Sequence, residues 1–354
     1  MSNTQQFHPR WASAPGDTIA DLLEERDVSL DDFAHRMDCS LPAVQDLIHG
    51  QSPITIAIAR QLTLVLGASV EFWMSRDFQF REDTARIDSE WLAELPLSDM
   101  LTFGWLLHEP NPSDQLAACL RFFNVSSIHA WNHTYAALQE KVAFRTSMAF
   151  KSRPAAVAAW LRQGAIQAET IHCKPWDGTH FKKCLLIARS LTRAKDPKAF
   201  LPVLERSCAE SGVALVIVRS PAGCRASGAT TFLSREKALL LLSFRYLTDD
   251  QFWFSFFHEA GHLLLHGDQG LFLESDAAPT TPREREASGF AEDILIPPEF
   301  QEILRHLRPD AREVIRFARR AGVSPGIVVG QLQHSKRFKH NQLNSLKRRF
   351  RWMD

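Results

Sequence analysis

Several features of membrane-bound and secreted proteins are absent from this 354-residue sequence. It contains no apolar run of about 18 residues, the length that a membrane-spanning helix needs. Its start, MSNTQQFHPRW, lacks the charged and then apolar layout of a secretory signal peptide. The six cysteines are scattered and form no C-x-x-C pair, which fits free thiols in a reducing compartment. We therefore expect a cytoplasmic protein with no membrane partner.

Lysine is absent from residues 1–81, and this part of the chain is acidic. Six arginines there oppose eleven carboxylates, which gives a net charge of −5, whereas residues 301–354 carry a net charge of +9. Basic side chains that neutralise phosphates supply most of the nonspecific affinity of proteins for DNA. The N-terminal part therefore lacks the charge on which such binding depends.

A run of short helices is predicted for residues 16–78. Ser29 and Ser40 each precede an apolar-periodic segment, as N-capping serines do, and the turn MDCS joins the two segments into a helix-turn-helix. The pattern L-x-x-F-A-x-x-M…S-x-x-x-V-x-x-L-I-x-G, with the closing G-x-S-x-E-F-W, resembles the helix-turn-helix of HigA-type antitoxins and the wider Xre/Cro repressor group. The resemblance implies an all-α DNA-binding domain over residues 12–84.

The helix that would read DNA in this domain departs from the usual pattern of that group. Polar and basic residues are expected at its start, but this chain has Leu41, Pro42, Ala43, Gln45 and Asp46. Gln45 alone can read a base edge through a side-chain donor and acceptor. Two interpretations stay open. The domain binds DNA, or it docks on a protein or forms a homodimer, and Gln45 is the candidate contact for either.

The remainder of the chain divides into three predicted parts. Residues 85–195 indicate a helical connector without a chemical motif. Within residues 196–335, a helix precedes the short apolar runs VALVIV, ATTFLS and ALLLLSFR, which are typical of strands. Residues 336–354 form a basic segment. The expected fold class is α+β and mostly helical, with one small β-sheet in residues 196–335.

The stretch FSFFHEAGHLLLH, residues 254–266, places three histidines and a glutamate among apolar side chains. Thr248-Asp-Asp-Gln251 has the form of a capping box, and Gly267 has the form of a helix end. These signals predict one continuous helix over residues 249–266.

An H-E-x-x-H motif lies on this helix. His258 and His262 are four residues apart and share one face, and Glu259 lies about 100° round from His258. In this motif two imidazoles bind zinc, and the glutamate acts as a general base on water. The alternative is a core helix whose histidines bond to their neighbours. That alternative is unfavourable, because an unpartnered buried Glu259 would cost several kcal/mol.

A third metal ligand is predicted on the next helix, which begins at Thr281-Pro282 and ends at Pro297-Pro298. A tetrahedral catalytic site needs three protein ligands and one open position. Glu284 lies within about 60° of the small buried residues of this helix, whereas Glu286 lies about 200° from Glu284. We select Glu284 and keep Glu286 as the alternative ligand. The simpler explanation of both is a charged first turn favoured by the helix dipole.

The sequence FWFSFFHEAGHLLLHG, followed by EREASGFAEDILIP, resembles the ImmA/IrrE family of zinc metallopeptidases. In that family a helix of the pattern E-x-x-A-x-x-F-A-x-x-L-x-x-P follows H-E-x-x-H. The resemblance implies a minimal zincin-like domain with His258, His262 and Glu284 as Zn²⁺ ligands and Glu259 as general base. Ser288 is a mild departure, because Asn or Asp is common there.

The resemblance also implies a function in regulation. Members of that family occur fused or adjacent to Xre-type proteins, and several cleave or inactivate a repressor. We therefore expect a regulatory metallopeptidase whose protein substrate is a repressor or a toxin–antitoxin partner. The alternative is a DNA-binding regulator or antitoxin whose zinc domain is sensory or structural.

Two further features leave alternatives open. His266, one turn beyond His262, either contacts substrate or steadies the site, or it is an exposed helix-end histidine favoured by the dipole. The basic segment HSKRFKHNQLNSLKRRFRW contacts nucleic acid, docks on the acidic N-terminal domain, or is a solvated tail.

Overall fold

A computed structural model describes residues 11–144, 152–267, 271–275 and 281–352. The chain forms two compact units, one ending at Glu94 and the other beginning at Leu95. The expected α+β, mostly helical fold class is confirmed. In the described ranges, no helix has both the length and the apolar character needed to span a membrane.

The N-terminal unit contains five helices within its described residues. They are α1 (Pro15–Glu25), α2 (Leu30–Arg36), α3 (Leu41–Ile48), α4 (Ile56–Leu66) and α5 (Val70–Glu94). The predicted caps are confirmed, because the Ser29 side chain accepts a hydrogen bond from the Asp32 N–H and Ser40 accepts one from Ala43. The core of this unit includes Phe33 from α2 and Val44 from α3, so the helix-turn-helix packs as one body.

Helix α5 is much longer than predicted and continues through residue 84, where we expected the domain to end. The sequence of its exposed middle lacks the regular spacing of apolar residues from which a helix is predicted. Ion pairs one turn apart support it instead: Arg81 lies 2.8 Å from Asp77, and Arg86 pairs with both Asp83 and Glu90.

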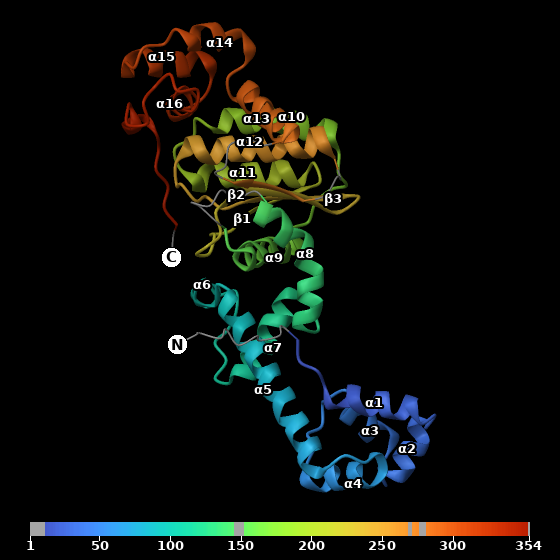
Figure 1. The fold of residues 1–354 in the computed structure, drawn as a ribbon. Coiled ribbons are helices and arrows are strands. Elements are labelled where there is room, and N and C mark those ends of the chain that lie inside the picture. The colour runs from blue at the N-terminus through green and yellow to red at the C-terminus, as the bar shows by residue number, and fades with distance from the viewer. Residues whose placement is uncertain (1–10, 145–151, 268–270, 276–280, 353–354) are drawn as a thin grey trace, which may run out of the picture. The chain divides into compact units, whose positions relative to one another are not determined.

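The second unit is built from helices around one sheet (Figure 1). Its elements before the sheet are α6 (Leu97–Thr102), α7 (Pro112–Phe123), α8 (Ile128–Phe144), α9 (Pro154–Thr170), α10 (Gly178–Leu191) and α11 (Pro197–Ala209). The sheet region contains β1 (Val213–Ile217), β2 (Ala226–Ser234), β3 (Lys237–Leu242), α12 (Asp249–His266) and β4 (Phe272–Ser275). After it come α13 (Pro282–Leu295), α14 (Pro298–Arg305), α15 (Ala311–Ala321), α16 (Pro325–His334) and a 3-10 turn (Asn344–Leu346).

The sheet has the strand order β1-β3-β2-β4, so β1 and β4 are its edges. β1 pairs with β3 in parallel, and β2 is antiparallel to both β3 and β4. Helices α11 and α12 cover one face and α9 covers the other (Figure 1). Leu240 therefore joins the α12 core, while Leu241 meets Gly164 of α9. Burial of both faces explains why β3 is an unbroken apolar run.

Residues 317–328 repeat the F-A-x-R-x-x-x-S-x-x-x-V pattern of residues 33–44, and this repeat was not predicted above. The two segments share an N-capping serine at the second helix and a positive φ two residues before it, at Asp38 and Gly322. Their environments differ. The start of α3 is largely exposed, whereas α16 is largely buried against α12. The second copy of the pattern is therefore a structural support and not a surface for reading DNA.

The basic C-terminal segment packs on its own unit, so its interpretation as a wholly solvated tail is wrong. Lys347 Nζ lies 2.6 Å from Asp250 Oδ2, and the Arg348 N–H donates to Asp249 Oδ1 at 2.9 Å. Phe350 is buried in the main core and contacts the ring of Phe244. Exposed bases such as Arg351 remain for other partners.

The predicted capping box at Thr248 is also wrong, because the Thr248 side chain makes no capping hydrogen bond. The two carboxylates of the first turn are buried and serve tertiary contacts. Asp249 accepts hydrogen bonds from Ser324 Oγ at 2.7 Å and from Arg348, and Asp250 pairs with Lys347. A local pattern does not reveal partners that lie about 75–100 residues away.

Candidate metal centre

Helix α12 spans residues 249–266 as predicted, and it carries the H-E-x-x-H motif through the middle of the second unit. The helix is buried on nearly every side, because it packs on β2, β3, α13 and α16. His258 is 3% exposed, and Glu259 and His262 are 0% exposed. The motif therefore sits in a dry interior where its polar atoms need partners.

Three ligand atoms converge between α12 and α13. His258 Nε2 lies 3.1 Å from His262 Nε2, and Glu284 Oε2 lies 3.2 Å from His258 Nε2 and 3.6 Å from His262 Nε2. A tetrahedral ion with metal–ligand distances of about 2.0–2.2 Å separates its ligand atoms by about 3.3–3.6 Å. The separations of 3.1, 3.2 and 3.6 Å lie within about 0.2 Å of this range. The residues therefore fit a tetrahedral cation with N, N, O ligands, and they form the one such cluster within the described residues.

The local sequence explains how Glu284 reaches the two histidines. Thr281 caps α13 by accepting a hydrogen bond from the Glu284 N–H, which fixes the first turn. Gly261 lets the two helices approach closely, since a Cβ there would lie 3.0 Å from the Phe290 ring and 3.3 Å from Ala287 Cα. Glu284 is buried, whereas Glu286 is exposed.

The protonation states suit a metal. Burial raises the pKa of the Glu284 carboxyl, but the hydrogen bonds and charges of His258 and His262 outweigh burial and hold that pKa well below its ordinary value. Burial is the main cause that lowers the pKa of His262. The cluster therefore presents a carboxylate and a neutral imidazole, the forms in which both residue types bind metals.

The outward-facing ring nitrogens of both histidines also have partners. His258 Nδ1 lies 3.3 Å from Ser288 Oγ, and His262 Nδ1 lies 3.0 Å from His266 Nδ1. His266 Nε2 lies in turn 3.0 Å from Glu286 Oε2. If His262 Nε2 faces a metal, its Nδ1 carries the proton and donates to His266, whose own proton is then on Nε2 and donates to Glu286.

His266 is 7% exposed, so its interpretation as an exposed helix-end histidine is wrong. The structure instead places it behind His262, in the position of a residue that steadies the site. Glu286, the alternative ligand, contacts His266 and not the two motif histidines.

We expect Glu286→Gln to weaken metal binding without abolishing it. The amide loses the charge that orients His266, and loss of such outer partners weakens metal affinity by about 10–100-fold. Competition with a chelator of known affinity measures the effect. Asp293→Asn is the matched control, because Asp293 is an exposed acid on the same helix. Equal metal affinity in Glu286→Gln and wild type would show that the contacts from Glu286 through His266 to His262 do not affect metal binding.

Glu259 is held against the sheet. Its Oε2 accepts a hydrogen bond from Thr230 Oγ1 of β2 at 2.8 Å, and both residues are fully buried. Gly228 on the same strand makes room for it, since a Cβ there would lie 2.6 Å from both Glu259 Cγ and Oε1. The carboxylate therefore has a fixed position next to His258, which suits a general base.

Gly228→Ala tests this close approach. We expect the variant to keep its metal and to lose about 100-fold in catalytic rate, because a displacement of about 1 Å at a reacting group has effects of that size. Cleavage rate and bound metal are measured together. Gly289→Ala serves as control, since a Cβ at Gly289 meets nothing within 4 Å. An unaffected rate in Gly228→Ala would mean that Glu259 adapts freely.

Three residues at the site were not predicted from the sequence: Thr230, Gly228 and Phe272. The Phe272 ring stacks on His262 at 4.4 Å. Gly228 left a signal, because an isolated glycine within a strand often marks a close approach. Thr230 and Phe272 were not predictable in this way, because the sequence of an ordinary strand does not indicate which residues its side chains contact. In the separate N-terminal unit, Gln45 is exposed on α3.

Comparisons with known proteins match both parts of the chain. Residues 213–333, from β1 to α16, match the model of the IrrE N-terminal-like domain, peptidase M78. The N-terminal region is similar to YddM, an uncharacterized HTH-type transcriptional regulator of Escherichia coli strain K12. The two sequences are 35% identical over 68 residues, which cover 19% of this chain and 68% of YddM.

Proposed function

Because this chain belongs to the HTH-type transcriptional regulators by its N-terminal region and carries a peptidase M78 domain, we propose that it is a regulatory zinc metallopeptidase. Its substrate is a repressor or another partner protein that it cleaves or inactivates to control transcription. The observation that carries this proposal is the buried convergence of His258, His262 and Glu284. Glu259 follows His258 directly and is fixed against the sheet by Thr230.

In this mechanism His258, His262 and Glu284 hold Zn²⁺, for which two imidazoles, one carboxylate and an open position are a common catalytic donor set. When bound there, the ion would supply Lewis-acid polarisation of the substrate carbonyl and would acidify water. Glu259 takes a proton from the attacking water on its carboxylate and later delivers it to the leaving amine. Thr230 Oγ1 donates a hydrogen bond to Glu259 Oε2, which holds the carboxylate in place for this transfer.

Glu259→Gln tests the proposed reaction. The amide has nearly the same shape and cannot accept the proton, so we expect cleavage to slow by at least about 10²-fold while zinc remains bound. Purified full-length protein is incubated with a proteome-derived peptide library, and new N-termini are counted by mass spectrometry. Zinc is measured on the same preparations.

Two results would contradict the proposal in different ways. Full activity in Glu259→Gln would remove the general-base role. A wild-type protein that binds one zinc per chain but cleaves neither the library nor co-purifying proteins would favour the alternative function. In that alternative, the metal domain is sensory or structural, and the exposed α3 with Gln45 acts on DNA. Retardation of genomic fragments at low salt would then be expected.

A further inference from the structure

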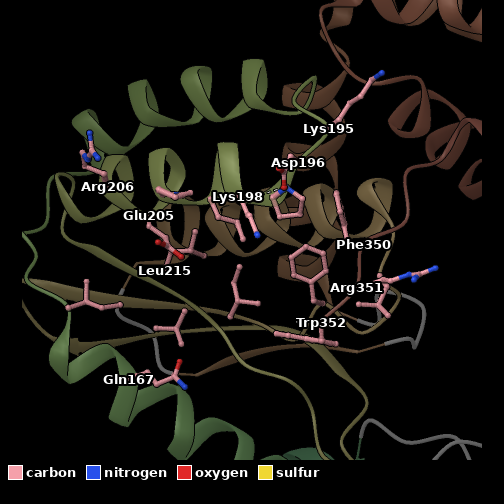
Figure 2. A pocket seen from close by; sticks show the side chains of 18 of the residues that line it. Gln167, Lys195, Asp196, Lys198, Glu205, Arg206, Leu215, Phe350, Arg351 and Trp352 are labelled. Atoms are coloured by element: carbon pink, nitrogen blue, oxygen red, sulfur yellow. Dashed lines mark hydrogen bonds between the residues drawn. The ribbon is translucent and has the colours of Figure 1, made fainter. Parts of the chain in front are cut away.

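A groove with a volume of about 1120 Å³ runs along β1, the sheet edge opposite to β4. Helix α11 and the end of α9 form its walls, and Leu215 of β1 lies at its floor (Figure 2). Phe350 and Trp352 of the C-terminal segment line one end. His262 contacts Phe272 of β4, and Glu259 contacts Thr230 of β2, whereas the groove lies along β1, so the groove is separate from the metal centre.

Along the groove, the edge of β1 has no backbone hydrogen-bond partner among the described residues. The Ala238 N–H donates to Gly212 O, and the Val218 N–H donates to Leu242 O. In a parallel pair only alternate residues bond to the neighbouring strand, so residues 212, 214, 216 and 218 face β3. The N–H and C=O groups of Leu215 and Ile217 therefore point away from β3 and into the groove that both residues line. No described residue bonds to them on that side.

The groove has an apolar floor and a basic rim. Leu201, Leu215 and Ile217 give the floor its apolar character. The rim carries five exposed bases and two carboxylates: Lys195, Lys198, Arg206, Arg349 and Arg351 against Asp196 and Glu205. Across the described ranges, no carboxylate forms an ion pair with any of these five bases. The groove thus offers unpaired positive charge beside a strand with open backbone groups.

We propose that this groove binds an extended, acidic segment of a partner protein, which adds to β1 as a fifth strand. Strand addition satisfies the open N–H and C=O groups of Leu215 and Ile217, and alternate side chains of the segment enter the apolar floor. Acidic side chains of the segment meet the basic rim. A nucleic acid or a fatty acid would satisfy the charges but would leave the strand edge unpaired. The proposal does not depend on catalysis at the metal.

The test uses the full-length protein and a fluorescein-labelled peptide of alternating glutamate and valine, about nine residues long, enough to span β1 at roughly 3.3 Å per residue. We expect saturable binding in fluorescence anisotropy and slower hydrogen exchange at the amides of Leu215 and Ile217. A peptide N-methylated at alternate residues keeps its charge but loses the donors that pair with the strand, so it should bind at least about tenfold more weakly.

Two protein variants separate strand addition from side-chain contacts. Ile217→Pro removes the N–H that faces the groove and leaves the ladder to β3 intact, as proline at a sheet edge can. Ile217→Ala removes the same apolar side chain but keeps the N–H. We expect Ile217→Pro to bind the peptide at least about tenfold more weakly than Ile217→Ala, with both variants folded by circular dichroism.

A charge variant tests the rim. Lys198→Glu with Arg206→Glu should weaken the acidic peptide at least about tenfold, and a peptide with lysine in place of glutamate should not bind wild type. The proposal is overturned by any of three results: no saturable binding up to about 1 mM, equal binding of the N-methylated peptide, or binding without protection of Leu215 and Ile217. If a single-stranded oligonucleotide displaces the peptide, and the amides of Leu215 and Ile217 show no protection, the groove would bind nucleic acid instead.

Discussion

The variant Glu284→Gln is expected to lose its zinc during purification, whereas wild type keeps about one ion per chain. Glu284 Oε2 is the carboxylate oxygen nearest to both motif histidines, at 3.2 and 3.6 Å. An amide in its place supplies a weak neutral ligand and no negative charge. The remaining two imidazoles do not complete the three-ligand set of a catalytic site. Metal content by mass spectrometry after dialysis measures the loss.

Glu286→Gln is the matched control for this variant, because it makes the same chemical change two residues away. The expected 10–100-fold weakening in Glu286→Gln corresponds to about 1.4–2.7 kcal/mol, so this variant should keep more zinc than Glu284→Gln. A Glu284→Gln protein that retains zinc with unchanged chelator competition would exclude Glu284 as a ligand. Loss of zinc in Glu286→Gln alone would assign the ligand to Glu286.

The sequence predicted the part of the site that helix geometry determines. His258 and His262 share a face because they are four residues apart, and Glu284 lies on the buried stripe of α13. The sheet residues that complete the site were not predictable in this way. Thr230 and Gly228 touch Glu259 only because β2 pairs centrally in the sheet, and strand order depends on contacts that a local pattern does not contain.

The two F-A-x-R-x-x-x-S-x-x-x-V segments show the same limit for the fold. Each begins its second helix at a capping serine, Ser40 or Ser324, which local propensity determines. One second helix is exposed and the other is buried, which depends on what the rest of the chain places beside them. The same reason explains the error at Thr248. Its neighbouring carboxylates resemble a dipole-favoured first turn, yet they bind Ser324, Lys347 and Arg348.

Lys347→Met is expected to destabilise the second unit by about 3–5 kcal/mol, the usual effect of removing one partner of a buried ion pair. Asp250 is 4% exposed, and its carboxylate lies 2.6 Å from Lys347 Nζ. Methionine keeps most of the aliphatic stem but leaves this carboxylate buried without its cation. The ion pair also holds the C-terminal segment beside α12, so its loss should loosen the packing of Phe350 in the core. The midpoint of thermal unfolding measures the change, with the exposed Lys339→Met as control.

The double variant Asp250→Leu with Lys347→Met distinguishes the charge from the packing. If the unpaired carboxylate causes the loss, replacing both partners by apolar residues should recover most of the stability, because an apolar pair of similar volume often equals a buried ion pair. The coupling between the two sites should then exceed about 1 kcal/mol. If the loss of unfolding free energy in the double variant equals the sum of the losses in the two single variants, the packing of these side chains and not their charge holds the C-terminal segment. A wild-type unfolding midpoint in Lys347→Met would show that the Lys347–Asp250 ion pair contributes nothing to the stability of the second unit.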